Sequence, residues 1–333
     1  MAPTQIGRYR VEEQLGEGGV GMVFAAHDPE LGRRVAVKLL RPDRLGSDPA
    51  RAGERLREEA QAMARLAHPN VATVFDVGEH DGGVYIAMEL IEGKSLRDWL
   101  DETIRPWKEV LSMYFQAGRG LAAAHDQGLV HRDFKPGNCI RGEDGRVRVL
   151  DFGLARAIDA DEPATATGTG TSVDTGSLHE EITGAGALLG TLPYMSLEQL
   201  QGRPAGPRSD QFSYCVALYE ALHATRPFPS RSAALRQQAL EDGVPPRTRP
   251  EIVVPHRLRR VLLRGLAPHP EARWPSMHAL LDALRRALRP WWRRPHVLIP
   301  AAVLAAGGLV GLVAEPHPAP CADAQRHLDG IWD

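Results

Sequence analysis

The sequence contains little cysteine and no marked excess of charge of either sign. Its three cysteines, Cys139, Cys215 and Cys321, are odd in number and far apart, which argues against a disulfide framework and a cysteine metal motif. The formal net charge of −2 creates no overall field that would attract nucleic acid, so no nucleic-acid partner is expected. With 43% hydrophobic and 25% charged residues, the chain has a globular composition, and local sites must provide its function.

The N-terminus lacks the apolar core of a signal peptide, and one long apolar run occurs near the other end. Residues 297–314, VLIPAAVLAAGGLVGLVA, contain no charge and have the minimum length of a transmembrane helix. Pro300 and two adjacent glycines weaken its helical propensity. A buried apolar helix or an Ala/Gly-rich tail is the alternative interpretation.

The residues flanking this run favour a membrane span. After it, only Arg326 is basic, whereas arginines and tryptophans precede it: Arg285, Arg286, Arg289, Trp291, Trp292, Arg293 and Arg294. This asymmetry predicts a single-pass protein of the cytoplasmic (inner) membrane, with its N-terminal part in the cytoplasm. Residues 289–296 would be a juxtamembrane segment and 315–333 a short extracytoplasmic tail. Gly307 and Gly311 form a G-x-x-x-G pattern that suggests a homodimer.

The order of strand and helix patterns predicts an α+β protein. Residues 9–40 and 71–91 read as strands, the latter with a turn at Asp81-Gly82-Gly83, and residues 51–66 read as a helix. Helical patterns dominate after residue 95. Strands first and helices later indicate a small sheet-rich lobe and a larger helical lobe. The segment 159–187 is rich in Thr and Gly and cannot bury much apolar surface.

A glycine-rich stretch, LGEGGVGMVF, occupies residues 15–24. Gly16, Gly18 and Gly21 have the G-x-G-x-x-G spacing, but strand rather than helix follows, which disfavours a dinucleotide-binding turn. The glycines therefore belong in a hairpin tip, where backbone N–H groups can approach phosphates. An ordinary flexible hairpin is the alternative.

Lys38 follows an apolar strand pattern in VAVK, residues 35–38. Strand alternation places it on the same face as Ala36. A lysine in a strand is usually a solvated edge charge. Its significance depends on whether a carboxylate lies opposite.

Glu59 is the candidate for that carboxylate. It lies three residues after Leu56 and four before Met63, on the apolar face of the predicted helix. A buried carboxylate needs a partner, and Lys38 is the natural one. Glu58 is the rival, but it points about a quarter-turn away from the apolar stripe.

Polar residues crowd the loop HRDFKPGN, residues 131–138. Asn138 and Asp151, the latter at the end of a predicted strand, offer the oxygen ligands that Mg²⁺ prefers. Asp133 is then left for a substrate hydroxyl, and Lys135 can balance phosphate charge.

Together, these motifs resemble the eukaryotic-type (Hanks-type) serine/threonine protein kinase family. The matching positions are Gly16, Gly18, Gly21, Lys38, Glu59, the loop at 131–138, DFG at 151–153, GTLPYMSLE at 190–198, Asp210 and Arg273. The resemblance implies a bilobal kinase-like fold over residues 9–288, with an N-lobe to about 91 and a C-lobe from 92, plus one C-terminal transmembrane helix. Lys135 and Thr191 favour the serine/threonine class, and the sequence looks most like the bacterial membrane-anchored kinases.

The resemblance implies ATP and Mg²⁺ as cofactors, with Mn²⁺ as an alternative metal. Asp133 would orient the substrate hydroxyl beside Lys135, Lys38 positioned by Glu59 would hold phosphates, and Asn138 and Asp151 would bind the metal. The implied nucleotide-binding residues are Leu15, Gly16, Glu17, Gly18, Gly19, Val20, Gly21, Val23, Ala36, Lys38, Met88, Glu89, Ile91 and Ile140.

Further positions have implied regulatory or structural roles. Arg132 would receive a phosphorylated activation-segment residue, for which Thr183, eight residues before Thr191, is preferred. Competing hydroxyls are Thr165, Thr167, Thr169, Thr171, Ser172, Thr175 and Ser177. Glu198 would pair with Arg273, and His131 would be a packed structural residue. The family pattern is broken at Leu197, which replaces a proline, and at Phe134, which replaces a leucine.

The function that this resemblance implies is phosphate transfer from ATP to protein Ser and Thr hydroxyls, with autophosphorylation and a role in bacterial signal transduction. Two other classes remain: a membrane-tethered pseudokinase that only binds, and a small-molecule phosphotransferase of similar fold. The complete catalytic set argues against the first. The GTLPYMSLE segment and Arg273, which imply a protein-substrate platform, argue against the second.

Overall fold

A computed structural model describes residues 3–18, 21–40, 49–152, 188–229, 232–243 and 254–288, without the side chains of 49–52 and 188–189. Contacts divide the chain into two units, 1–287 and 288–333, and the strands and helices below belong to the first, apart from the last residue of the final helix. Gly19, Val20, Thr183, the 159–187 segment, the proposed span at 297–314 and its Gly307/Gly311 motif lie outside the described residues. Within the described ranges, none of the helices combines the length and apolarity needed to cross a bilayer.

The N-terminal part is an antiparallel six-stranded sheet with the order β1-β2-β3-β4-β6-β5. The predicted turn is confirmed: Asp81 and Gly82 both have positive φ, which a two-residue hairpin between β5 and β6 favours. The strands are β1 (Gln5–Ile6), β2 (Tyr9–Glu17), β3 (Gly21–Asp28), β4 (Arg33–Leu40), β5 (Val74–His80) and β6 (Gly83–Glu89).

The two faces of β4 serve two different cores, as strand alternation predicted. Val35 and Val37 belong to a small apolar cluster on one face, and Leu39 packs against it. Ala36 and Leu40 belong to the main core on the other face. Lys38 shares this second face with Ala36, so its side chain points toward the main core rather than toward solvent.

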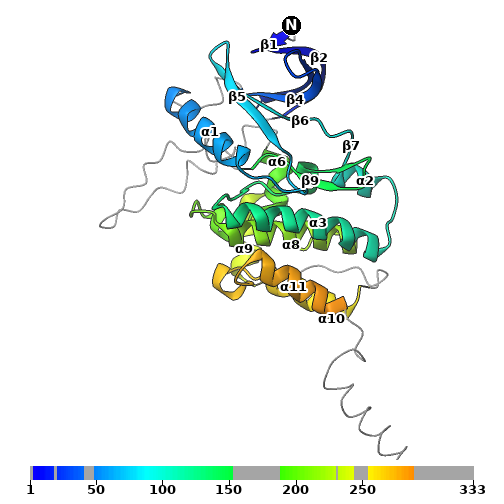
Figure 1. The fold of residues 1–333 in the computed structure, drawn as a ribbon. Coiled ribbons are helices and arrows are strands. Elements are labelled where there is room, and N and C mark those ends of the chain that lie inside the picture. Colours follow the sequence, from blue (N-terminus) through cyan, green and yellow to red (C-terminus); the bar gives the residue numbers. More distant parts are fainter. Residues whose placement is uncertain are drawn as a thin grey trace, which may run out of the picture. The chain divides into compact units, whose positions relative to one another are not determined.

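Helix α1 (Pro49–Ala64) corresponds to the predicted helix and packs against β5 (Figure 1). Leu56 is fully buried and Met63 is 6% exposed, so the apolar stripe faces the core as expected. The helix ends two residues before Leu66, which is nevertheless buried beyond its end. This packing fixes the face of α1 on which Glu59 lies.

Helices dominate the rest of the described residues, together with a small sheet of the order β7-β8-β9 (Figure 1). The strands are β7 (Gly93–Ser95), β8 (Cys139–Gly142) and β9 (Val147–Val149). The helices are α2 (Leu96–Asp101), α3 (Trp107–Asp126), α6 (Leu188–Thr191), α7 (Leu197–Leu200), α8 (Pro207–His223), α9 (Ala233–Glu241), α10 (His256–Gly265) and α11 (Met277–Leu288). Short 3-10 turns occur at η2 (Pro136–Asn138), η3 (Leu192–Tyr194) and η4 (Pro270–Ala272).

Helix α8 is the centre of this helical part, because every residue from Ser209 to Tyr219 is buried. It packs against α3, and Phe212 and Tyr214 are fully buried. A helix that is buried on all sides carries polar side chains only where they have partners. Asp210 is also fully buried, so its carboxylate must have hydrogen-bond partners.

The predicted pair of Glu198 and Arg273 is confirmed. Both Oε atoms of Glu198 accept hydrogen bonds from Arg273, at 2.7 and 2.9 Å, and the two residues are 4% and 1% exposed. Burial acts to raise the pKa of Glu198, but the hydrogen bonds and charge of Arg273 outweigh it, so the pKa lies below its usual value. This pair joins α7 to the segment before α11.

Candidate active site

The glycine-rich hairpin connects β2, which ends after Leu15, Gly16 and Glu17, to β3. Gly18 and Gly21 exchange backbone hydrogen bonds at 2.8 and 3.3 Å, which closes the tip tightly. A Cβ on Gly21 would lie 2.2 Å from the carbonyl oxygen of Leu39, so this close approach of β3 to β4 requires glycine. A Cβ on Gly16 would meet nothing within 4 Å, which leaves open space beside the strand.

The strands of the sheet bring several of the expected nucleotide-binding residues into register. Val23 on β3 lies opposite Lys38 on β4, and Ala36 lies opposite Met88 on β6. Glu89 ends β6, and its carboxylate forms an ion pair with Arg148 at 2.8 Å. Ile91 follows that strand, and Ile140 lies on β8 of the small sheet.

Lys38 forms an ion pair with Asp151, with 2.8 Å between Nζ and Oδ2. Asp151 follows the strand β9 in the left-handed conformation, at φ 59°, which is unusual for a residue with a side chain. Burial acts to raise the pKa of this carboxyl, but the charge and hydrogen bond of Lys38 outweigh it, so the pKa lies below its usual value. The ion pair joins the sheet to the segment after the small sheet.

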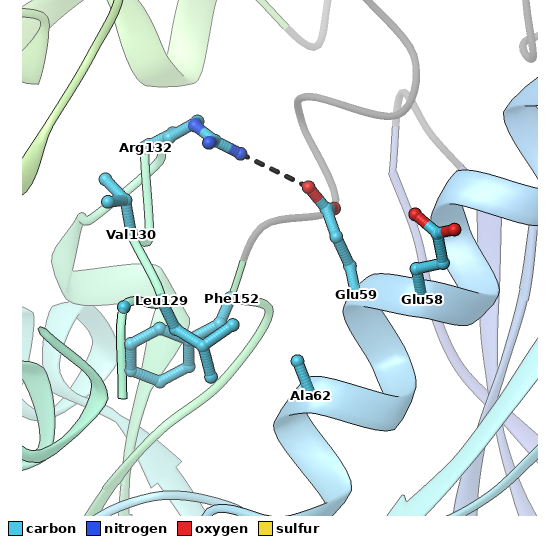
Figure 2. Close-up of a pocket in the computed structure, with 8 residues that line it drawn as sticks. Glu58, Glu59, Ala62, Leu129, Val130, Arg132 and Phe152 are labelled. Atoms are coloured by element: carbon cyan, nitrogen blue, oxygen red, sulfur yellow. Dashed lines mark hydrogen bonds and ion pairs between the residues drawn. The ribbon is translucent and has the colours of Figure 1, made fainter. Parts of the chain in front are cut away.

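The expected pairing of Glu59 with Lys38 differs from the one observed. Glu59 instead forms an ion pair with Arg132, with 3.3 Å between Oε1 and Nη1. Figure 2 shows the carboxylate of Glu59, rather than that of Glu58, directed toward Arg132. The physical reason is competition between two carboxylates. Asp151 forms the ion pair with Lys38, and Glu59 forms one with Arg132 of the loop instead.

A cavity of about 180 Å³ lies beside this pair, between α1 and the loop (Figure 2). It is lined by Glu58, Glu59, Ala62, Gly128, Leu129, Val130, Arg132 and Phe152. Apart from the three charged groups its lining is apolar. The Glu59–Arg132 pair therefore has open space beside it, and α1 is not fully packed against the loop at this point.

Asp133 lies at the centre of a hydrogen-bonded loop. Its Oδ2 accepts from Lys135 at 2.7 Å and from the side-chain amide of Asn138 at 3.2 Å. The same lysine donates to the hydroxyl of Thr191 at 2.8 Å, which links the loop to the segment before η3. The other oxygen, Oδ1, is buried and has no hydrogen-bond partner in the part of the chain that the structure describes. Asp133 thus presents one fixed and one unengaged oxygen.

Asn138 and Asp151 lie next to each other through the backbone, because the N–H of Leu150 donates to the carbonyl oxygen of Asn138. The side-chain amide nitrogen of Asn138 donates two hydrogen bonds to Asp133, one to its backbone carbonyl oxygen and one to its carboxylate. This orients the amide with its nitrogen toward Asp133, which leaves its oxygen for another partner. An amide oxygen and a carboxylate form a donor set that suits Mg²⁺.

Asp210 holds the loop in place, and the sequence alone did not assign this role. Its carboxylate accepts from the backbone N–H groups of His131 and Arg132, each at 2.7 Å, and lies 2.8 Å from Nε2 of His125. Arg132 has φ 66°, so these bonds stabilise a strained backbone immediately before Asp133. The sequence signal was an aspartate in the first turn of a helix whose following residues are largely apolar.

His131 is a packed structural residue, as predicted. It is fully buried, and its ring lies 4.8 Å from that of Phe152 and 5.8 Å from that of Phe134. Phe134, which is 1% exposed, therefore fills an apolar site. These contacts pack the loop against the residue that follows Asp151.

Comparisons with known proteins agree with this geometry. Serine/threonine-protein kinase PknA of Mycobacterium tuberculosis is 37% identical over 298 residues, which cover 88% of this chain and 64% of that protein. Serine/threonine-protein kinase PksC of Streptomyces coelicolor is 34% identical over 335 residues, 96% of this chain and 57% of that protein. The chain therefore spans 64% or less of the length of these two relatives.

The crystal structure of the Mycobacterium tuberculosis PknI kinase domain matches with a TM-score of 0.60 and 24% identity, over 85% of this chain and 97% of that one. This likeness confirms the bilobal fold predicted from the sequence. The family model described as "Protein kinase domain" matches residues 9–282, which include all the candidate site residues. The chain therefore belongs to the protein kinase family, and it resembles the bacterial serine/threonine kinases of the PknA and PknB group.

Proposed function

We propose that this chain transfers the γ-phosphate of ATP to Ser and Thr hydroxyls of proteins. The observation that carries the proposal is Asp133, whose Oδ2 is held by Lys135 and Asn138 while its buried Oδ1 is unengaged in the described part of the chain. A carboxylate oxygen so placed can orient an acceptor hydroxyl and take its proton. The hydroxyl oxygen forms the new bond to the γ-phosphorus, and the bond from that phosphorus to the departing ADP breaks.

The residues around Asp133 fit ATP and a divalent cation. Asn138 and Asp151 would hold Mg²⁺, and Mn²⁺ would suit the same oxygen atoms. When bound, the metal neutralises phosphate charge. Lys38, which is only 9% exposed, would exchange part of its contact with Asp151 for the α- and β-phosphates. The hairpin at Gly16–Gly21 would cover the phosphates, with Val23, Ala36 and Met88 on the adjoining strands next to the adenine.

The preference for Ser and Thr is supported by the contact between Lys135 and Thr191. The lysine joins the carboxylate of Asp133 to the segment that precedes η3, on the acceptor side of the site. The names of the relatives, which are serine/threonine kinases, point in the same direction.

Phosphate transfer by the full chain tests this function. With Mg²⁺ and ATP labelled on its γ-phosphate, we expect label on Ser and Thr of the chain itself and of a generic basic protein, and none on Tyr. ATP binding is measured separately by calorimetry. Binding without transfer would contradict the proposal in favour of a pseudokinase, and transfer only to small alcohols would favour a small-molecule phosphotransferase.

We also propose that phosphorylation of Thr183 activates the enzyme through Arg132. In this structure the guanidinium of Arg132 holds Glu59, at 3.3 Å. A phosphate on the activation segment would compete for that guanidinium, because charge-assisted bonds to phosphate are strong. Glu59 would then be released to position Lys38, as an active kinase requires. Thr191 would contribute through its bond to Lys135.

Replacing Thr183 with Ala is expected to lower the activity of the autophosphorylated chain by a factor of about 5 to 150, the range of typical coupling free energies. Phosphopeptide mapping of active protein should find phosphate on Thr183. The matched control is Thr165→Ala, which removes a hydroxyl from the same segment and should leave activity unchanged. An active chain with unmodified Thr183 would overturn this regulatory role.

Residues 297–314 are proposed to anchor the kinase in the cytoplasmic membrane by a single span. The support is the uncharged run itself and the arginines and tryptophans that precede it. Gly307 and Gly311 would allow two such spans to pair as a homodimer. The kinase domain would then lie in the cytoplasm, where ATP is available.

A further inference from the structure

Positive charge is concentrated in one part of this nearly neutral chain. Ten arginines and only two acidic residues, Glu271 and Asp282, stand between residues 254 and 294, a formal charge of +8 in a chain whose total is −2. The remainder of the chain is therefore acidic. A concentration of like charge favours association with a partner of the opposite charge where the charged side chains reach solvent.

Helix α10 presents part of this charge to solvent as one stripe. Arg257, Arg260 and Arg264 are exposed and follow the i, i+3, i+7 spacing of a single helix face. Leu258 and Leu262 lie on the opposite face and are fully buried. The packing of the leucines therefore fixes the direction in which the arginine stripe points.

The stripe is not neutralised by carboxylates of the described residues. Arg257 and Arg260 form no ion pair or hydrogen bond there, whereas Arg285 on α11 is paired with Asp282 at 2.9 Å. Arg264 lies over the ring of Trp274, 4.1 Å from its centre, and donates to backbone carbonyls, which leaves its charge in place. The stripe therefore keeps three positive charges, and its guanidinium N–H groups can donate further hydrogen bonds.

We infer that this stripe, Arg257, Arg260 and Arg264, binds the surface of an anionic lipid bilayer. The planar guanidinium of arginine donates to two phosphate oxygens at once, which suits the phosphodiesters of acidic headgroups. Each basic residue near such a surface strengthens binding by about fivefold.

Chain continuity favours a bilayer over another polyanion. Only ten residues separate Arg286 from residue 297, where the uncharged run begins. Even if these residues were fully extended, Arg286 would lie within about 40 Å of the start of that run. Five of the ten arginines and both interfacial tryptophans lie between α11 and that run or within the last turn of α11. The inference rests on the proposed membrane span for its proximity, but the charge of the stripe is independent of it.

Arginine footprinting on the full chain tests the inference. The protein is reconstituted into bilayers of phosphatidylcholine alone, or with about a third of phosphatidylglycerol, and treated with an arginine-specific dicarbonyl reagent. We expect modification of Arg257 and Arg260 to slow severalfold only in the anionic bilayers, and to recover at high salt because surface charges are screened. Exposed Arg10 and Arg119 are internal controls whose rates should not change. Equal rates at the stripe in both bilayers would overturn the inference.

A pair of variants separates this inference from the proposed span. The span is tested independently, by whether the chain resists extraction from membranes at alkaline pH. If alkali extracts the chain, its binding to phosphatidylglycerol vesicles, measured by flotation, should be about 30-fold weaker in Arg257→Gln/Arg260→Gln than in the parent. The matched variant Arg10→Gln/Arg119→Gln, with the same change in charge, should float as the parent does. Equal flotation of both variants would overturn the inference, and so would protection of the stripe by duplex DNA but not by anionic vesicles.

Discussion

Replacing Asp133 with Asn is expected to lower phosphate transfer by about a hundredfold to ten-thousandfold, the usual contribution of a positioned general base. The amide is nearly isosteric, but it cannot take a proton from the acceptor hydroxyl. Its nitrogen would also face Lys135 or Asn138, both of which donate to the present carboxylate. The measurement is the rate of label transfer from ATP to protein, at saturating ATP.

ATP affinity should change little in this variant, because Lys38 and the glycine hairpin are untouched. The matched control is Asp242→Asn, the same substitution at an exposed residue after α9, which should leave the rate unchanged. A rate close to that of the parent in Asp133→Asn would remove Asp133 from the catalytic role. An equal loss of ATP binding and of transfer would instead indicate that the loop had collapsed.

Replacing Arg273 with Ala is expected to reduce the free energy of unfolding by about 3–5 kcal/mol, the cost of leaving a buried charge without its partner. Glu198 is 4% exposed and would lose two hydrogen bonds. The backbone carbonyls of Ala267, Arg208 and Pro268 would also lose a donor. Urea unfolding of the full chain, followed by circular dichroism, measures the change.

The control for this variant is Arg285→Ala, which breaks an exposed ion pair with Asp282. Exposed pairs contribute little, so its unfolding free energy should stay within about 1 kcal/mol of that of the parent. A loss of that small size in Arg273→Ala would mean that the buried pair does not stabilise the fold.

The same pair makes stability depend on pH. Because the pKa of Glu198 in the folded protein lies below its ordinary 4.5, the unfolded chain takes up a proton more readily. The contribution of the pair is therefore complete above that value and is lost as the pH falls through the lower folded-state pKa. In Arg273→Ala this acid-dependent part of the unfolding free energy should be reduced, which a pH series of urea midpoints would detect.

Much of the candidate site was predictable because its residues are close in the sequence. Asp133, Lys135 and Asn138 lie within one short loop, so their meeting needed no long-range contact. The alternation around Lys38 was equally local, since a strand places residues two apart on one face. The pair of Glu198 and Arg273, 75 residues apart, was predicted only through the family resemblance.

Other partners could not be read from the sequence because several charged groups compete for them. Glu59 lay on the correct face of α1, yet it pairs with Arg132, 73 residues away, rather than with Lys38. Of the two carboxylates near Lys38, those of Glu59 and Asp151, the one that forms its ion pair is Asp151. Periodicity specifies a face, but the choice among competing ions depends on how α1 and the loop are packed.

By itself, the sequence predicted the strand regions at 9–40 and 71–91, the helix at 51–66, the helical character after residue 95, the polar loop at 131–138 and the family. These follow from local periodicity and motif spacing, which are properties of neighbouring residues. Tertiary structure alone decided that Asp210 binds the backbone of His131 and Arg132, and that Glu59 lies against Arg132. It also decided that Arg257, Arg260 and Arg264 of α10 point outward, because Leu258 and Leu262 of that helix are buried against the core. Contacts between distant segments depend on packing, which no local pattern specifies.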